Sequence, residues 1–131
     1  MLQTAENGKI RIFVDYSQLT VGGDTEINTI KRIMNISASY FYEVFNVTRL
    51  PRLYFPKNTS RTCNALTIPV VYVDNGTIGD LGIVVGNENM QDAVYIAKST
   101  PCAFLESSRR PIWGMIMFNN VYLKYDQGGF Q

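Results

Sequence analysis

Residues 24–45 read DTEINTIKRIMNISASYFYEVF, and this stretch decides the fold. Its apolar side chains recur at steps of three, four and seven, which places them on one stripe of a helix of about five turns; they are Ile27, Ile30, Met34, Phe41 and Phe45. Gly22-Gly23 breaks the chain just before it, and Asp24 is suited to cap the helix. We therefore predict an amphipathic helix over 25–45 with one buried face.

Short strands are predicted on both sides of this helix. A first strand is indicated at Lys9–Asp15, and later strands are indicated at Arg52–Phe55, Thr67–Val73, Asp80–Gly86, Ala93–Ala97 and Ile112–Phe118. This order predicts an α/β (α+β) fold, a twisted mixed sheet of about five strands with one long backing helix. No repeat or linker divides residues 1–131, so we expect a single domain. Because one helix covers one sheet face, we expect that the other face is open and is covered by a companion chain or the remainder of a longer polypeptide.

Composition excludes several classes of protein. Twelve basic against eleven acidic residues give a net charge of +1, which argues against nucleic-acid binding by phosphate neutralisation. No apolar run is long enough for a transmembrane segment. The chain has no His, which excludes catalytic triads and His-based metal sites, and the cysteine spacing is not that of a CxxC motif. We therefore predict no catalytic residue, no metal ligand and no cofactor within the chain itself.

Two weaker patterns are better explained by solvated surface. Glu88 and Asp92 are two carboxylates that could in principle act as an acid/base pair, but polar residues spaced along a loop are usually solvated. Basic residues interleaved with Tyr54 and Phe55 could contact a polyanion, although a solvated strand face is the favoured interpretation; they are Arg49, Arg52, Lys57 and Arg61.

The compartment is indicated by cysteines and glycosylation motifs. Cys63 and Cys102 form either a disulfide or buried thiols, and a bond would close a loop of about 40 residues, worth roughly 4 kcal/mol. Candidate N-glycosylation acceptors occur at Asn35, Asn46, Asn58 and Asn75. Together they favour an extracellular or cell-surface protein of the secretory pathway. The polar segment 1–9 lacks the apolar core of a signal peptide, so we expect a removed leader or a piece of a longer protein.

Three ordered motifs lie in the C-terminal half: DLGIVV at Asp80–Val85, YIAKSTPC at Tyr95–Cys102 and RRPIWGMIMFN at Arg109–Asn119. Together they resemble the leishmanolysin-like zinc metallopeptidases, most of all the set found in ciliated protozoa. The resemblance covers about residues 9–123. It implies a metzincin-like upper subdomain, with Ile10–Val14 as first strand, Asp24–Phe45 as backing helix and Ile112–Phe118 as the last strand before the active-site helix.

The resemblance also implies functional elements. Ala93, Val94, Tyr95, Ile96 and Ala97 would form the edge strand along which such enzymes lay an extended peptide or protein substrate. Cys63 and Cys102 would be partners in an internal disulfide. In the parent family, two His residues of an HExxH helix bind zinc and the Glu is the general base.

This sequence contains no HExxH and stops at Gln131, about where that helix is expected to begin. Our first hypothesis is therefore an incomplete N-terminal part of a leishmanolysin-like catalytic domain, inactive by itself. The second is a catalytically inactive secreted or cell-surface binding or structural module that pairs through its sheet edge. The third is an intracellular interaction domain with free thiols.

Overall fold

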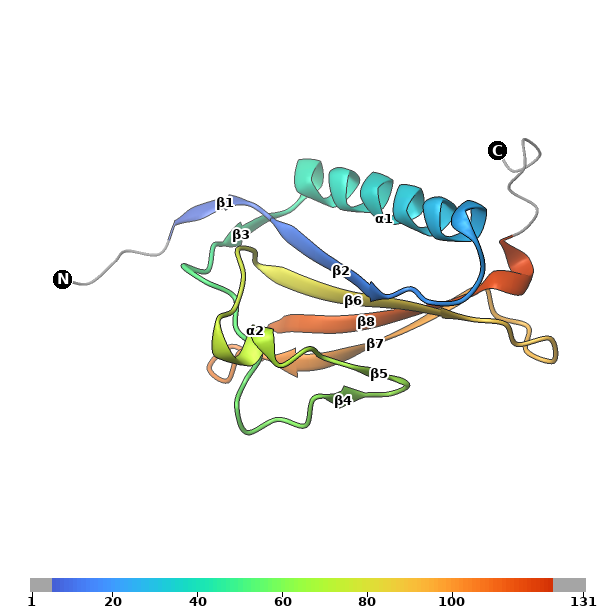
Figure 1. Cartoon of the computed structure of the whole chain (residues 1–131). Coiled ribbons are helices and arrows are strands. Elements are labelled where there is room, and N and C mark those ends of the chain that lie inside the picture. The colour runs from blue at the N-terminus through green and yellow to red at the C-terminus, as the bar shows by residue number, and fades with distance from the viewer. Residues whose placement is uncertain (1–5, 124–131) are drawn as a thin grey trace.

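The computed structural model describes residues 6–123, and Figure 1 shows the order of their elements. The elements are β1 (Asn7–Lys9), β2 (Ile12–Gln18), α1 (Asp24–Val44), β3 (Asn46–Thr48), β4 (Thr62–Cys63), β5 (Leu66–Thr67), α2 (Val71–Asp74), β6 (Leu81–Glu88), β7 (Ala97–Phe104) and β8 (Pro111–Asn119), followed by a 3₁₀ turn at Asn120–Tyr122. The expected mixed α/β class with one long helix is confirmed.

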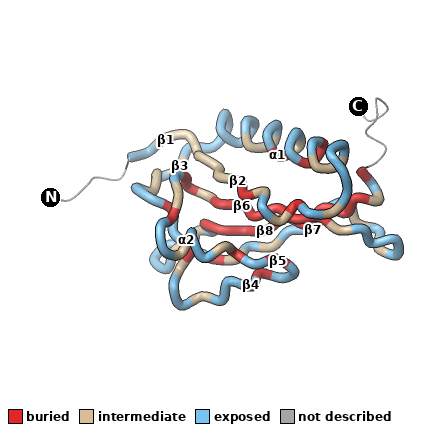
Figure 2. The backbone as a smooth tube through the Cα atoms, in the orientation of Figure 1, coloured by how far each residue is buried: buried red, intermediate tan, exposed pale blue. Residues whose placement is uncertain are grey.

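The main sheet has four strands in the order β2-β6-β8-β7, where about five were expected. β2, β6 and β8 are parallel, and β7 pairs antiparallel with β8 at one edge. β6 and β8 are rich in Val, Ile and Met and are buried on both faces, as central parallel strands usually are. Figure 2 shows this buried centre of the sheet. Two small two-stranded sheets, β1-β3 and β4-β5, lie outside it.

Two predicted strands are wrong. Residues 52–55 form only one isolated bridge, from Leu53 to Thr77. Residues 67–73 contain the end of β5 and then the short helix α2. Pro69 explains the change, because its fixed φ suits a helical turn and its carbonyl accepts a hydrogen bond from Tyr72 N at 3.1 Å.

Helix α1 matches the predicted helix to within a residue at each end. Its N-cap is Gly23 rather than Asp24, and Glu26 Oε1 accepts a hydrogen bond from Gly23 N at 3.0 Å. Gly22 makes the turn into the helix with φ +89°, a left-handed conformation that favours glycine. Asp24 becomes the first helical residue, where its negative charge stabilises the positive end of the helix dipole.

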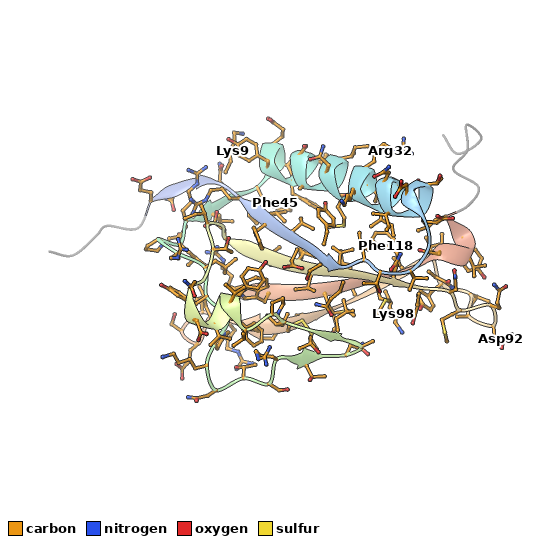
Figure 3. All side chains as sticks on the ribbon, viewed as in Figure 1. Lys9, Arg32, Phe45, Asp92, Lys98 and Phe118 are labelled. Carbon is orange, nitrogen blue, oxygen red and sulfur yellow. A yellow bond between two sulfur atoms is a disulfide. The ribbon has the colours of Figure 1, made fainter. Side chains whose placement is uncertain are left out.

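The apolar stripe of α1 packs on one face of the sheet. Ile30 and Met34 are buried against Val85 of β6 and Phe118 of β8. In Figure 3, Phe118 lies beneath α1. Because side chains alternate between the two faces of a strand, the neighbouring residues of β6 and β8 face the opposite side.

That opposite face is covered by the chain itself, so the expectation of an open second face is wrong. The cover is residues 49–78, called here the covering segment, and Figure 1 shows its β4, β5 and α2 below the sheet, opposite α1. Leu53, Phe55 and Ile68 of this segment are almost completely buried. They pack with Trp113 and Met115 of β8 in one apolar cluster. The ring of Phe55 lies edge-on to that of Trp113, 6.2 Å between centroids.

Two links fix the covering segment to the sheet. A disulfide joins Cys63 of β4 to Cys102 of β7, with a Cα–Cα distance of 5.6 Å. At the other edge, the side-chain amide of Gln18 imitates a strand backbone: its Nε2 donates to Thr67 O at 2.6 Å, and its Oε1 accepts from Thr67 N at 3.0 Å. The segment is therefore held at both sides of the sheet.

A buried ion pair joins the start of β2 to the start of β6. The Asp80 carboxylate is fully buried and accepts hydrogen bonds from Arg11 Nε at 3.0 Å and Nη2 at 3.1 Å. It also accepts from the backbone N–H groups of Arg11 at 2.9 Å and Leu50 at 2.8 Å. Burial by itself raises the pKa of Asp80, but these donors and the Arg11 charge outweigh burial and hold the pKa below its ordinary value.

A second buried carboxylate belongs to Asp15 in β2. It accepts hydrogen bonds from the Tyr72 hydroxyl and from Ser17 N, the latter at 2.8 Å. Burial, and then this hydrogen bond to Asp15, raise the pKa of Tyr72 well above its ordinary value. The bond anchors α2 of the covering segment to the sheet.

Candidate functional site

An apolar groove runs between α1 and the sheet, and it has a volume of about 340 Å³. Its helix wall includes Ile33 and Phe41, and its sheet wall includes Ile83 of β6, Ile116 of β8 and Ser99 of β7. Four strands span about 14 Å between the outer strand axes, and one helix is only about 10 Å wide. The groove follows from this mismatch, because a single helix cannot cover the whole face.

The sheet wall of the groove is only partly covered. Ile83 and Ile116 are half-buried, whereas Val85 and Phe118, directly under α1, are buried. Ser99 on the edge strand is exposed. The α1 face is therefore covered less completely at the groove, where the half-buried side chains of the two central strands are apolar.

Helix α1 also presents apolar residues away from the sheet. Ile36, Tyr40 and Val44 recur every four residues and are 62, 62 and 50% exposed. Phe41 and Phe45 stack at its C-terminal end with 5.5 Å between ring centroids. Phe41 and Phe45 belong to the predicted buried stripe but are 38 and 50% exposed, so the predicted burial is wrong at this end of the helix. Helix α1 is apolar on more than one face.

Charged and polar side chains lie near the β7 side of the groove. Lys98 Nζ lies 3.7 Å from Glu88 Oε2 and 5.0 Å from the ring centre of Tyr95. Glu88 Oε2 and the Tyr95 hydroxyl are buried atoms without a hydrogen-bond partner among the described residues. The 3.7 Å distance makes Lys98 the ion-pair partner of Glu88. This differs from the acid/base pair of Glu88 with Asp92 that the sequence suggested. Figure 3 shows Asp92 in the loop away from Lys98.

The edge strand lies further along the chain than predicted. β7 begins at Ala97, which pairs with Phe118, and continues to Phe104. Ala93, Val94, Tyr95 and Ile96 precede it in the loop after β6, and the predicted strand position was wrong for these four residues. Val94 is 92% exposed. A substrate role for this edge stays a prediction.

The remaining predicted residues are placed as follows. Cys63 and Cys102 form the disulfide described above, which is confirmed. The four candidate glycosylation acceptors lie at the surface in different elements: Asn35 on α1, Asn46 in β3, Asn58 in a loop of the covering segment and Asn75 directly after α2. All four are exposed, and their modification stays a prediction.

Sequence reasoning missed a cluster of buried amides at the carboxyl ends of β6 and β8, the edge where α/β sheets commonly bind ligands. Asn87 donates to Val21 O at 2.7 Å and to Asn120 Oδ1 at 3.2 Å. Asn119 donates to Met90 O and accepts from Met90 N, both at 3.1 Å. These amides fasten neighbouring loops, so their hydrogen bonds are already used within the chain.

Within residues 6–123, no three metal-binding side chains gather at one point. None of the helices in this range is long and apolar enough to span a bilayer. No family model matches the chain, and a search of the curated proteins finds no match to it. The resemblance to leishmanolysin-like metallopeptidases therefore rests on the three sequence motifs, and the family stays a prediction.

Proposed function

We propose that this chain is the N-terminal part of the catalytic domain of a leishmanolysin-like zinc metallopeptidase, to which it supplies the sheet, the backing helix and the substrate-edge strand. The observation that carries the proposal is the apolar groove beside α1. A second amphipathic helix lying in this groove would bury Ile83 and Ile116, the apolar residues that α1 leaves half-exposed.

The order and direction of the elements support the same proposal. The first strand of the main sheet, β2, leads into α1, and its last strand, β8, is flanked by the antiparallel edge strand β7. The sequence resemblance implies this succession of first strand, backing helix, antiparallel edge strand and last strand. The disulfide is compatible with the extracellular or cell-surface location that we propose.

The residues of this chain do not fit zinc. The chain has no His, and residues 6–123 hold no cluster of metal-binding side chains. In the proposal, zinc and the general base belong to another part of the polypeptide, and this chain performs no catalytic step of its own. Its role is to position an extended peptide along β7 and to seat the zinc-carrying helix.

Peptide mapping, zinc analysis and a peptidase assay on the native protein test the proposal. We expect the polypeptide to contain an HExxH helix, to bind one equivalent of zinc and to hydrolyse a peptide. A native protein that consists of residues 1–131 only, stable as a monomer and free of zinc, would refute it.

Thiol labelling tests the groove directly. Ser99→Cys places a reactive group in the groove, and Ser107→Cys, in the exposed turn after β7, is the matched control. We expect the thiol at position 99 to react at least about tenfold more slowly in the full native polypeptide than in the chain alone, because a packed helix excludes the reagent. The control should react equally in both. Equal reactivity at position 99 would contradict a helix in the groove.

The alternative is a catalytically inactive secreted or cell-surface module that pairs a partner strand with β7. It is favoured by the free outer edge of β7, which pairs only with β8 within the described residues. This alternative predicts no zinc and a partner whose binding is abolished by Ser99→Pro, because proline removes a backbone donor from the edge.

A further inference from the structure

A larger concave surface lies on the other side of the sheet from the α1 groove. It has a volume of about 730 Å³, within the range of ligand pockets. One wall is residues 50–59 of the covering segment, and the other is the end of β7 with the turn into β8. We call it the covering-segment pocket. Because the disulfide between Cys63 and Cys102 joins the covering segment to β7, the two walls are held together before any ligand arrives.

The charge of this pocket is positive. Arg52, Lys57 and Arg109 line it, against the single carboxylate of Glu106, which gives a local charge of +2 where the whole chain carries +1. Within residues 6–123, none of the three cations lies in an ion pair. Like charges that converge without a counter-charge favour the binding of an anion.

Two of the cations are held in position by neighbouring groups. Arg52 donates through Nε to Asn75 O at 2.6 Å, which leaves its terminal nitrogens free to bind a ligand. The Arg109 guanidinium carbon lies 5.9 Å from the ring centre of Phe104. Its backbone, at φ 60°, is fixed by a hydrogen bond from Arg109 N to Leu105 O at 2.8 Å. Both guanidinium groups are therefore oriented in advance, which suits the recognition of carboxylates.

The rest of the lining is mostly apolar and includes Leu50, Phe104 and Ile112. Phe104 is 40% exposed and offers a ring surface beside the Arg109 charge. A ligand that fills this pocket must therefore carry apolar groups next to its negative charges. A sulfated polysaccharide has the charges without the apolar groups, whereas an acidic peptide with interspersed apolar residues has both.

We propose that the covering-segment pocket binds an acidic, partly apolar peptide segment of a partner protein, with its carboxylates on Arg52, Lys57 and Arg109. The proposal does not rest on the proposed peptidase function, because the α1 groove that carries that function lies on the opposite face of the sheet and the two sites share only strands β7 and β8. Failure of the peptide-binding test would leave the peptidase proposal standing, and failure of the peptidase test would leave this one standing.

Fluorescence anisotropy with a labelled peptide of alternating Glu and Leu tests the proposal, with a Lys–Leu peptide and a heparin-type oligosaccharide as comparison probes. The variants are Arg52→Gln, Lys57→Gln and Arg109→Asn, since Asn tolerates a positive φ. The matched control is Lys31→Gln, which removes one charge from exposed α1. We expect each pocket variant to weaken binding of the acidic peptide about threefold to tenfold, and we expect the control to leave it unchanged.

The acidic peptide should also bind several-fold more weakly at 200 mM than at 50 mM salt. Lys57→Gln keeps the test decisive if another variant fails to fold, because Lys57 makes no hydrogen bond to a described residue. Acidic-peptide binding that is equal in the three variants and the control would overturn the proposal. Tighter, variant-sensitive binding of the oligosaccharide than of the peptide would overturn it in favour of a glycan site.

Discussion

Replacement of Asp80 by Asn should destabilise the protein by about 3 kcal/mol, near the lower end of the cost of breaking a buried ion pair. The carboxylate accepts four hydrogen bonds, three from Arg11 and one from Leu50 N. An Asn at this position keeps one acceptor oxygen, but its NH₂ group replaces the other. Some of the four N–H donors then face another donor and have no acceptor. Arg11 is 31% exposed and can reach water, which keeps the cost from being higher. For a domain of this size, the melting temperature should fall by about 10 °C.

The size of this effect should depend on pH. The folded-state pKa of Asp80 is lowered, so its contribution to stability is complete above the unfolded pKa, about 4. The contribution is lost as the pH falls through the lower folded pKa. The difference in unfolding free energy between wild type and Asp80→Asn should therefore be constant from about pH 7 to pH 5 and shrink below about pH 4.

Urea unfolding followed by tryptophan fluorescence measures this difference, because Trp113 is the single tryptophan and is fully buried. Asp92→Asn is the matched control, since this exposed loop residue should change stability by less than about 0.5 kcal/mol. The reasoning would be refuted by a loss below about 1 kcal/mol at pH 7, or by a loss that stays the same down to pH 3.

Three further predictions concern the covering segment and the sheet. Joint replacement of Cys63 and Cys102 by Ala should lower the unfolding free energy by about 4 kcal/mol in urea unfolding, and a wild type that is equally stable with and without reductant would contradict this. Gly82→Ala should cost about 1–3 kcal/mol, because a Cβ there would lie 2.5 Å from the buried Trp113 ring; an unchanged thermal midpoint would refute this close contact. Tyr72→Phe should cost about 1–2 kcal/mol at neutral pH, because it removes the hydroxyl that donates to the buried carboxylate of β2. Since the pKa of Tyr72 is raised, that difference should persist below about pH 10 and decline at higher pH; a difference that already declines between pH 7 and 9 in chemical unfolding would argue against it.

The sequence predicted best those elements whose pattern is local. The spacing of apolar residues located α1, because it repeats at the helical period along the whole segment, although only Thr29, Ile30 and Met34 are buried. The dense apolar run of β8 was equally clear. The edge strand was misplaced because an edge is largely exposed: Ala97–Phe104 is polar, and the more apolar residues before it drew the prediction into the loop.

The covered second face could not be predicted in the same way. Leu53 and Phe55, like Leu66 and Ile68, are buried two residues apart as in a strand, but neither pair belongs to a strand of the main sheet. Their burial depends on contacts with a β8 residue such as Trp113, far away in the sequence. The groove beside α1 was also hidden, because it arises from the width of a four-strand sheet under one helix and not from any motif.

The composition of β7 bears on how copies of the protein avoid aggregating with one another. An unpaired sheet edge invites intermolecular strand pairing, and natural proteins commonly oppose it with lysine, proline or local irregularity. β7 has all three: Lys98, Pro101, and shifts of register on either side of Ala103. The pairing is regular only over Ala97–Pro101, which is shorter than the roughly six or seven residues, free of proline, that typically template a fibril.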